Sequence, residues 1–264
     1  MKDVGVCMAL FLEFFMTLEA FFSENPVCAL AFSGGVDSAF LLYAGAKAGA
    51  DIKAYYLKTP FQPEFERADA LRLAGELKVE LSLVPFDILS VPGIADNPAD
   101  RCCLCKRTMF SQLKALAESE GRALLIDGTN ASDREEERPG MIALRELGVR
   151  SPLRECGIDK AKVRALSREA GLFTWDKPSY SCLATRLSAG ERITPAGLER
   201  IETAETRLSA LGFRDFRVRV SGNSAKLQVT AAQMGTAFEK RADILAALGD
   251  MFESLTLDLK EREA

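Results

Sequence analysis

The 264-residue sequence contains no histidine. This absence excludes Ser-His-Asp and Cys-His catalytic arrangements and every metal site that needs an imidazole ligand. The motif G-x-x-x-x-G-K-[ST], whose lysine contacts the γ-phosphate in many nucleotide-binding enzymes, is absent as well. The seven cysteines therefore become the main candidates for thiol chemistry or for binding a soft metal.

The chain has neither a surplus of positive charge nor a long uninterrupted apolar run. Its net charge of −4 disfavours a nucleic-acid partner and argues for a small-molecule substrate. The most apolar stretch, residues 8–22, is interrupted by Glu13 and Glu19, and its apolar positions have helical spacing. We therefore expect an amphipathic helix packed on the body of a cytoplasmic protein, with no signal peptide and no membrane partner.

Strand and helix patterns alternate over the first half of the chain. Strands are predicted at 27–32, 52–57, 79–85 and 123–127, and helices after the first strand, at 64–77 and at 102–120. This alternation predicts an α/β fold, a parallel sheet with helices on both faces that binds its ligands at the carboxyl ends of the strands.

The pattern changes further along the chain. Residues 127–192 are predicted to be irregular. From residue 194 the predicted elements are a helix, two strands, a helix and a strand, at 194–211, 216–220, 225–229, 231–248 and 255–259. We therefore expect two domains, the α/β domain at 1–190 and a smaller α+β domain at 191–264.

The most informative stretch is Ser33-Gly34-Gly35-Val36-Asp37-Ser38, between the first predicted strand and the helix after it. Adjacent glycines let the backbone turn sharply beside an anion, and the N–H groups that begin a helix attract negative charge. The hydroxyls of Ser33 and Ser38 add donors, whereas Asp37 repels phosphate unless it binds a bridging Mg²⁺. The loop predicts a nucleotide bound with Mg²⁺ and resembles the pyrophosphate loop of ATP-pyrophosphatases; a glycine turn that binds nothing is the alternative.

Two other pairs of residues are candidates for ligand contacts. Asp127 and Gly128 end a predicted strand at the expected active-site edge, where they suit contacts to an adenylate or a metal ion. Arg217 and Arg219 are two apart on a predicted strand, so they project from one face and can fork onto a single phosphate. The alternative for the arginines is a simple alternation in which they face water.

The cysteines form a C-x-x-C pair, Cys102 and Cys105, and a distant single residue, Cys182. An odd number of cysteines argues against a disulfide framework. A zinc site without histidine needs four cysteines, so Cys103 or Cys156 would have to complete it. Three thiolates can instead hold a [4Fe-4S] cluster that leaves one iron open. A C-x-x-C pair that binds nothing is the third possibility.

Six motifs, in order along nearly the whole chain, resemble those of the LarE family. They are S-G-G-V-D-S at 33–38, R-C-x-x-C-K at 101–106, D-G-T-N-A at 127–131, R-P-G at 138–140, V-R-S-P-L at 149–153 and K-P-x-x-x-C-L-A-x-R at 177–186. The resemblance implies an ATP- and Mg²⁺-dependent sulfurtransferase that helps to build a nickel-pincer nucleotide cofactor. It implies that a carboxylate of a pyridinium-biscarboxylate mononucleotide becomes an adenylate, with release of pyrophosphate, and then a thiocarboxylate.

Two versions of the sulfur step occur in this family. In one, a cysteine at the position of Cys182 gives up its own sulfur and ends as dehydroalanine. In the other, three cysteines bind a [4Fe-4S] cluster that delivers sulfide, and the pattern Cys102, Cys105 and Cys182 resembles this version. Leu104 departs from the polar or histidine residue of many relatives, and Cys103 is an extra thiol that can compete as a ligand.

The resemblance also implies that Arg217 and Arg219 bind the substrate phosphate and that Arg186 is a further anion-binding residue. It implies that the protein forms a homo-oligomer, and it leaves the source of the sulfur unknown. Glu202 and Glu205 can ligate a metal or form a solvated helix face. The competing functions are a tRNA thiolase, a zinc-stabilised amidating synthetase and a nucleotide sensor without turnover. The acidic charge disfavours the first of these.

Overall fold

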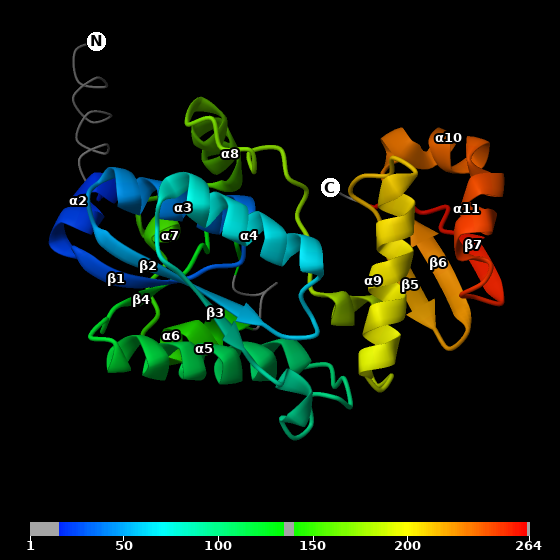
Figure 1. Cartoon of the computed structure of the whole chain (residues 1–264), viewed down its shortest axis with the longest axis horizontal. Helices are drawn as coiled ribbons and strands as arrows, with labels where there is room; N and C mark the ends of the chain where they lie inside the picture. The colour runs from blue at the N-terminus through cyan, green and yellow to red at the C-terminus, as the bar shows by residue number, and fades with distance from the viewer. Residues whose placement is uncertain (1–15, 135–139, 263–264) are drawn as a thin grey trace, which may run out of the picture. The chain divides into compact units, whose positions relative to one another are not determined.

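The computed structural model describes residues 16–134 and 140–262 (Figure 1). Its contacts divide the chain into two compact units. The first comprises the described residues up to Lys58, with Phe65–Phe86 and Cys102–Lys177, and the second comprises Thr59–Glu64, Asp87–Arg101 and the residues from Pro178 onward. These units are defined by contacts, whereas the predicted domains, 1–190 and 191–264, are parts that fold independently. The domain boundary near residue 190 therefore stays a prediction.

The first unit is built on a four-stranded parallel sheet, as the alternating pattern predicts. Its strands are β1 (Val27–Ala31), β2 (Asp51–Lys58), β3 (Leu81–Pro85) and β4 (Leu125–Ile126). They lie in the order β3-β2-β1-β4, and every pair is parallel. Because β2 and β3 lie on one side of β1 and β4 lies on the other, the chain changes direction between β1 and β4, where sheets of this type bind ligands.

Helices cover both faces of this sheet (Figure 1). The helices α3 (Val36–Lys47) and α4 (Glu64–Leu77) lie on one face, and α5 (Arg101–Ser119) and α6 (Gly140–Glu146) on the other. Alternate strand residues point to two separate cores, as the pleat requires. Leu30 and Tyr56 belong to the core under α3 and α4, whereas Ala29 and Tyr55 belong to the core over α5.

The helix expected at 8–22 is α2 (Leu18–Glu24) in the part of the chain that the structure describes. The hydroxyl of Thr17 caps it by accepting from the Ala20 amide at 3.1 Å, and Phe21 and Phe22 are buried in the first core. Residues 8–15 and the motif residue Arg138 lie outside the described residues.

The prediction that residues 127–192 are irregular is wrong. This stretch contains α6, α7 (Pro152–Glu155) and α8 (Lys160–Glu169). These helices are short, and α8 is mostly charged, so too few apolar positions repeat to show a helical period. The capping residue of α8 is the visible signal, since the Asp159 carboxylate accepts from the Lys162 amide at 2.7 Å.

The second unit contains a three-stranded mixed sheet, in the order β5 (Arg217–Ser221), β6 (Ser224–Gln228) and β7 (Ser254–Leu257). The strands β5 and β6 are antiparallel, and β6 and β7 are parallel. The helix α9 (Pro195–Ala210) packs against β5. This unit confirms the expected small α+β part of the fold.

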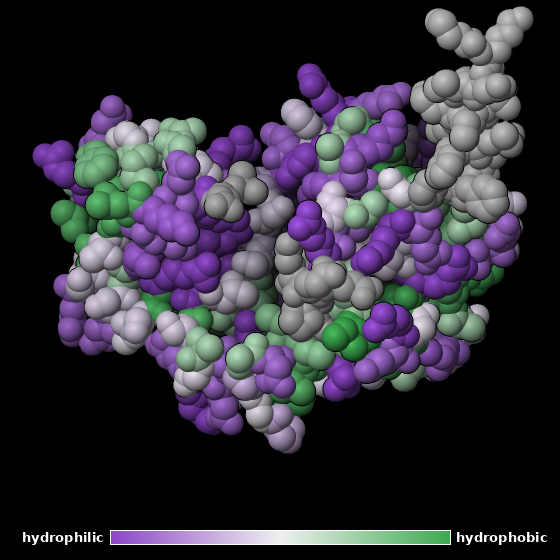
Figure 2. Space-filling model, turned by 180° about the vertical axis from the view of Figure 1, so that it is seen from behind, coloured by the Kyte–Doolittle hydropathy of each residue, from purple (hydrophilic) through white to green (hydrophobic). Residues whose placement is uncertain are grey.

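The single helix predicted at 231–248 is two helices, α10 (Ala231–Glu239) and α11 (Arg241–Leu248). The break is at Lys240, whose ammonium donates to the Leu211 carbonyl at 2.6 Å and fixes the corner. Phe238 and Leu245 are exposed on these helices, and Figure 2 shows hydrophobic surface over this region. Among the described residues, no helix has the length and apolar character needed to span a bilayer.

Candidate functional site

The predicted nucleotide loop follows β1 directly and leads into α3 in the first unit. Ser33 and Ser38 close it from both ends, with their Oγ atoms 3.0 Å apart. The Ser33 hydroxyl accepts from the Gly35 amide at 3.3 Å, and the Ser38 hydroxyl donates to the Gly35 carbonyl at 3.2 Å. The loop is therefore held in shape by its own hydroxyls before any ligand arrives.

The glycines of this loop meet two geometric demands. Gly34 has φ of +73°, in the left-handed region, and a Cβ there would lie 3.0 Å from the Glu66 carbonyl oxygen. Gly35 is the N-cap of the twelve-residue α3, and it has no side chain to cap the helix. The first amides of α3 thus remain available to an anion.

Asp37 stands in the first turn of α3 and contacts two residues from distant segments. Its carboxylate accepts from the Lys160 ammonium at 2.6 Å and from the Asn130 amide at 3.2 Å. Lys160 begins α8 and was missed by sequence reasoning. Lys160 lies outside all six sequence motifs, so nothing in the sequence marked it as a functional residue. The contact places a cation beside the carboxylate that is predicted to bind Mg²⁺.

Asp127 and Gly128 lie at the carboxyl end of β4, next to the loop, as expected. The Asp127 carboxylate accepts from the Thr129 hydroxyl at 2.6 Å and from the Ser151 hydroxyl at 2.7 Å. Both hydroxyls come from the D-G-T-N-A and V-R-S-P-L motifs, so these two motifs share one hydrogen-bond network. This network fixes the segment that packs on the start of α3.

Gly128 supplies a direct test of that packing. A Cβ at this position would lie 2.8 Å from the Ser38 amide nitrogen, and backbone cannot move aside cheaply. We expect Gly128→Ala to lose roughly 1–3 kcal/mol of unfolding free energy, as overpacking does, and to weaken ATP binding. Denaturant unfolding and ATP titration measure the two effects.

The matched control is Gly75→Ala in α4, where a Cβ meets no atom within 4 Å. This variant is expected to gain up to about 1 kcal/mol from helix propensity and to bind ATP normally. Similar ATP affinities for the two variants would contradict a close fit at Gly128.

Lys177 also contacts the loop. In the sequence it was noted only as the first residue of the K-P-x-x-x-C-L-A-x-R motif. Its ammonium donates to the Asp69 carboxylate at 2.6 Å and to the Gly34 carbonyl at 3.2 Å. The side chain is mostly buried, so this ion pair ties the residue to α4. Lys177 thereby holds the Gly34 backbone from outside the loop.

The cysteines of the first unit fall into two classes. Burial raises the pKa of Cys28 to about 12 and that of Cys156 to about 11, so neither thiol ionises readily near neutral pH. Cys102 and Cys105 lie one turn apart on α5, the first exposed and the second buried. Within either unit, no three acidic or cysteine side chains among the described residues are grouped closely enough to hold a metal ion.

Cys182 lies in the second unit, where it is the N-cap of the short 3₁₀ helix η2 (Leu183–Arg186). The Arg101 guanidinium donates to its sulfur at 3.7 Å. The contact places a guanidinium directly beside the sulfur within the second unit. Arg101 is therefore a functional candidate that sequence reasoning named only within a motif.

Two relatives establish the family. An uncharacterized protein of Synechocystis sp. is 36% identical over 82% of this chain and 81% of its own length. A pyridinium-3,5-bisthiocarboxylic acid mononucleotide synthase of Lactiplantibacillus plantarum is 32% identical over 92% of this chain and 89% of its own length. The chain belongs to the LarE family. No family model matches the chain.

Membership of the LarE family makes the protein a sulfurtransferase enzyme. A probable tRNA sulfurtransferase of Acetivibrio thermocellus is 26% identical over 70% of this chain but only 50% of its own length. This more distant likeness places the chain within the wider superfamily of enzymes that share the ATP-pyrophosphatase loop. The match covers only half of the tRNA sulfurtransferase, so it does not favour tRNA as the substrate.

Arg186 of this LarE-family protein is fully buried, and its ion-pair partner is Glu205 in α9. The Arg186 Nε and Nη2 atoms donate to the two Glu205 oxygens at 2.8 and 3.1 Å. Its Nη1 donates to the backbone carbonyls of Ser181 and Cys182 and to two hydroxyls. The predicted anion-binding role of Arg186 stays a prediction, while its contacts show that it holds the Cys182 segment in place.

Glu202 and Glu205, which sequence reasoning left undecided, have different surroundings. Glu202 accepts from the Glu64 amide at 2.6 Å. Glu205 is buried, and besides Arg186 it accepts from the Tyr180 hydroxyl at 2.5 Å and the Val218 amide at 3.0 Å. The Glu205 carboxylate thus joins α9, β5 and the segment before Cys182.

Arg217 and Arg219 lie on β5 with their side chains on the same face, but their environments differ. Arg217 is buried and Arg219 is exposed. Burial, followed by the charges of Arg186 and Arg262, lowers the pKa of Arg217 to about 10 and also lowers that of Arg219. The Asp215 carboxylate supplies a counter-charge within this group, 3.8 Å from Arg217 and 2.6 Å from Arg262. Their predicted role in binding the substrate stays a prediction.

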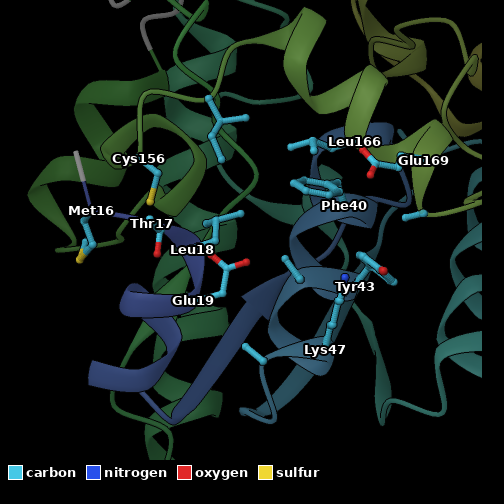
Figure 3. A pocket seen from close by; sticks show the side chains of 14 residues that line it. Met16, Thr17, Leu18, Glu19, Phe40, Tyr43, Lys47, Cys156, Leu166 and Glu169 are labelled. Atoms are coloured by element: carbon cyan, nitrogen blue, oxygen red, sulfur yellow. The ribbon is translucent and has the colours of Figure 1, made fainter. Parts of the chain in front are cut away.

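A cavity of about 580 Å³ in the first unit is separate from the nucleotide loop (Figure 3). It lies along α3 from Phe40 onward, where Phe40, Tyr43 and Lys47 line it, and Leu166 and Glu169 of α8 line its other side. The loop begins the same helix at its opposite end. None of the residues Ser33–Ser38 of the predicted nucleotide loop lines this cavity.

Proposed function

We propose that this LarE-family enzyme converts a carboxylate of a pyridinium-3,5-biscarboxylic acid mononucleotide into a thiocarboxylate at the expense of ATP. The likeness to the named synthase supports the substrate, and the geometry of the Ser33–Ser38 loop carries the reaction type. The carboxylate oxygen attacks the α-phosphorus of ATP, and pyrophosphate leaves. Sulfur then attacks the carbonyl carbon of the acyl adenylate, and AMP leaves with the former carboxylate oxygen.

The loop is suited to the first step because it combines free helix amides, two hydroxyls and a carboxylate. Gly34 leaves space where a Cβ would approach the Glu66 carbonyl, and the amides that begin α3 can donate to phosphate oxygens. Asp37 would hold Mg²⁺, which neutralises phosphate charge. Lys160, already 2.6 Å from Asp37, can turn to a phosphate oxygen when the metal takes the carboxylate. Adenylation then needs positioning and charge neutralisation and no histidine.

The sulfur step is proposed to use Cys102, Cys105 and Cys182 as ligands of a [4Fe-4S] cluster. The fit is supported by the helical spacing of Cys102 and Cys105, which puts neighbouring thiols on one face of α5. When bound, such a cluster supplies sulfide. The three thiolates would hold it, and the acyl adenylate formed on the substrate would present the activated carbonyl. The alternative is that Cys182 attacks directly and donates its own sulfur.

The arginines of the second unit are proposed to bind the negatively charged substrate. Arg219 is exposed and Arg217 is buried beside it, and the pKa of both is lowered by neighbouring cations as well as by burial. A phosphate would relieve this repulsion. The cytoplasmic location, expected from the sequence, and the homo-oligomer, implied by the resemblance, stay predictions.

The experiment that tests the reaction measures pyrophosphate release with ATP, Mg²⁺ and the pyridinium mononucleotide. We expect release only when the mononucleotide is present, and a product that is heavier by the exchange of oxygen for sulfur. ATP binding without release would identify a nucleotide sensor, and salt-sensitive binding of tRNA together with tRNA thiolation would identify a tRNA thiolase.

The experiment that separates the two sulfur routes compares Cys102→Ala with Cys103→Ala. By the cluster route, Cys102→Ala loses iron, acid-labile sulfide and thiocarboxylate formation, while Cys103→Ala keeps all three. By the sacrificial route, both variants remain active, and Cys182 loses about 34 Da as it becomes dehydroalanine. Zinc without iron in the purified wild type would instead support the amidating synthetase.

A further inference from the structure

Tyr180 stands at an unspecified position of the K-P-x-x-x-C-L-A-x-R motif, two residues before Cys182. Two guanidinium groups of the second unit lie over its half-buried ring. The ring centroid is 4.5 Å from the Arg186 Cζ atom and 5.1 Å from the Arg217 Cζ atom. The negative face of an aromatic ring attracts a cation within roughly 6 Å, so this one side chain attracts both arginines.

The hydroxyl of Tyr180 fixes the ring from its other end. It donates to the Glu205 carboxylate at 2.5 Å, and the same carboxylate accepts from Arg186. A hydrogen bond to a charged acceptor is stronger than one between neutral groups. Tyr180 therefore contacts Arg186 directly through its ring and indirectly through Glu205, and the ring is restricted in its orientation.

Arg186 and Arg217 carry like charges and lie close to each other. The charge of Arg186 contributes, after burial, to lowering the pKa of Arg217 to about 10, and the carboxylates of Glu205 and Asp215 act in the opposite direction. The ring of Tyr180 adds an attraction to both cations and brings no charge of its own. It therefore helps to keep the two guanidinium groups in neighbouring positions.

The two guanidinium groups in turn hold the backbone on either side of the tyrosine. Arg217 donates to the Ser179 carbonyl. Arg186 donates to the carbonyls of Ser181 and Cys182 at 2.9 and 3.3 Å. The cations that the aromatic ring attracts thus fix the segment that ends at the sulfur-bearing residue, so the position of the sulfur depends on this set of contacts.

We propose that Tyr180 is a positioning residue for the sulfur step and that it sets the place of the Cys182 sulfur through Arg186 and Arg217. The identity of the step rests on the proposed function, whereas the positioning rests on the contacts of Tyr180. A displaced sulfur, or a cluster held by a displaced thiolate, meets the acyl adenylate out of line and reacts more slowly. Removing the ring is therefore expected to slow the second step and to leave adenylation unchanged.

The test measures, at saturating mononucleotide, how much pyrophosphate is released for each thiocarboxylate formed. When sulfur does not reach the acyl adenylate, water attacks its carbonyl carbon, AMP leaves and the carboxylate returns. Tyr180→Leu and Tyr180→Met keep an apolar side chain without a π face. Each is expected to raise the ratio roughly tenfold to hundredfold, the cost of displacing a reacting group by about 1 Å. Tyr180→Phe keeps the ring and is expected to retain a ratio close to that of the wild type.

The matched control is Tyr43→Leu, which removes another half-buried ring, beneath the single cation Lys47 at 5.6 Å in the first unit. Equal ratios for Tyr180→Leu and Tyr43→Leu would overturn the inference. So would a proportional loss of pyrophosphate release and product in both Tyr180→Leu and Tyr180→Met, because the residue would then serve the fold alone. If Tyr180→Phe raised the ratio as much as Tyr180→Leu, the role of the ring would be wrong.

Alkylation by iodoacetamide, followed at Cys182 by peptide mass spectrometry, tests the positioning without the substrate. Tyr180→Leu is expected to react faster than the wild type, and Tyr180→Phe at nearly the wild-type rate. Equal rates for all three proteins would overturn the inference. A wild type that released no pyrophosphate, while Cys182 still reacted faster in Tyr180→Leu, would overturn the proposed function and leave the positioning role of Tyr180 standing.

Discussion

Asp37→Asn is expected to slow pyrophosphate release roughly 10²-fold to 10³-fold, the cost of removing one preorganised charge from a transition state. The substitution keeps the shape of the side chain but removes the negative charge through which the loop is proposed to hold Mg²⁺. It also removes the ion pair with Lys160 at 2.6 Å. A pyrophosphate assay over a range of Mg²⁺ concentrations measures the effect, and added Mg²⁺ is expected to restore part of the rate.

Asp51→Asn is the matched control for this variant. Asp51 pairs with Arg122 at 2.8 Å and is the first residue of β2. It therefore lies at the amino-terminal end of the parallel strands, whereas the loop lies at their carboxyl-terminal end. Its side chain is largely exposed, so losing this pair is expected to cost little stability and no activity. Equal rates for Asp37→Asn and Asp51→Asn would show that the loop carboxylate has no part in the chemistry.

The local signals in the sequence were sufficient for the sheet and for the nucleotide loop. Buried strands and the glycine pair are adjacent in the chain, so their pattern can be recognised without knowing the fold. Lys160 could not be found in this way, because 123 residues separate it from Asp37 and only the folded chain brings them together. Its own neighbourhood, a charged short helix, gave no sign of a functional contact.

The arginines show a second reason why sequence reasoning was incomplete. Alternation correctly placed Arg217 and Arg219 on one face of β5, but it could not show what each guanidinium contacts. Burial separates their roles, because a buried guanidinium must satisfy its donors within the protein.

The buried pair Arg186 and Glu205 is expected to produce the largest stability effect in the second unit. Their side chains are 0% and 7% exposed, and the pair is bidentate. Glu205→Gln leaves the guanidinium buried without a counter-charge, so we expect a loss of roughly 3–5 kcal/mol of unfolding free energy. Denaturant unfolding measures this loss.

Asp250→Asn provides the control, because Asp250 pairs at 2.7 Å with Arg207 of α9, the helix that carries Glu205, and these two side chains are 62% and 39% exposed. Its loss is expected to cost only about 0–1 kcal/mol. The double variant Arg186→Met with Glu205→Leu is expected to recover much of the stability lost by Glu205→Gln, because no unpaired charge remains. Equal costs for Glu205→Gln and Asp250→Asn would contradict the buried ion pair.

The same pair connects stability to the thiol. Arg186 donates to the carbonyls of Ser181 and Cys182, and Glu205 holds the guanidinium, so the ion pair fixes the segment that carries the sulfur. We therefore expect the double variant to fold but to react faster with iodoacetamide at Cys182 than the wild type, and to lose thiocarboxylate formation. An unchanged alkylation rate would show that the segment keeps its shape without Arg186, and the ion pair would then contribute to stability alone.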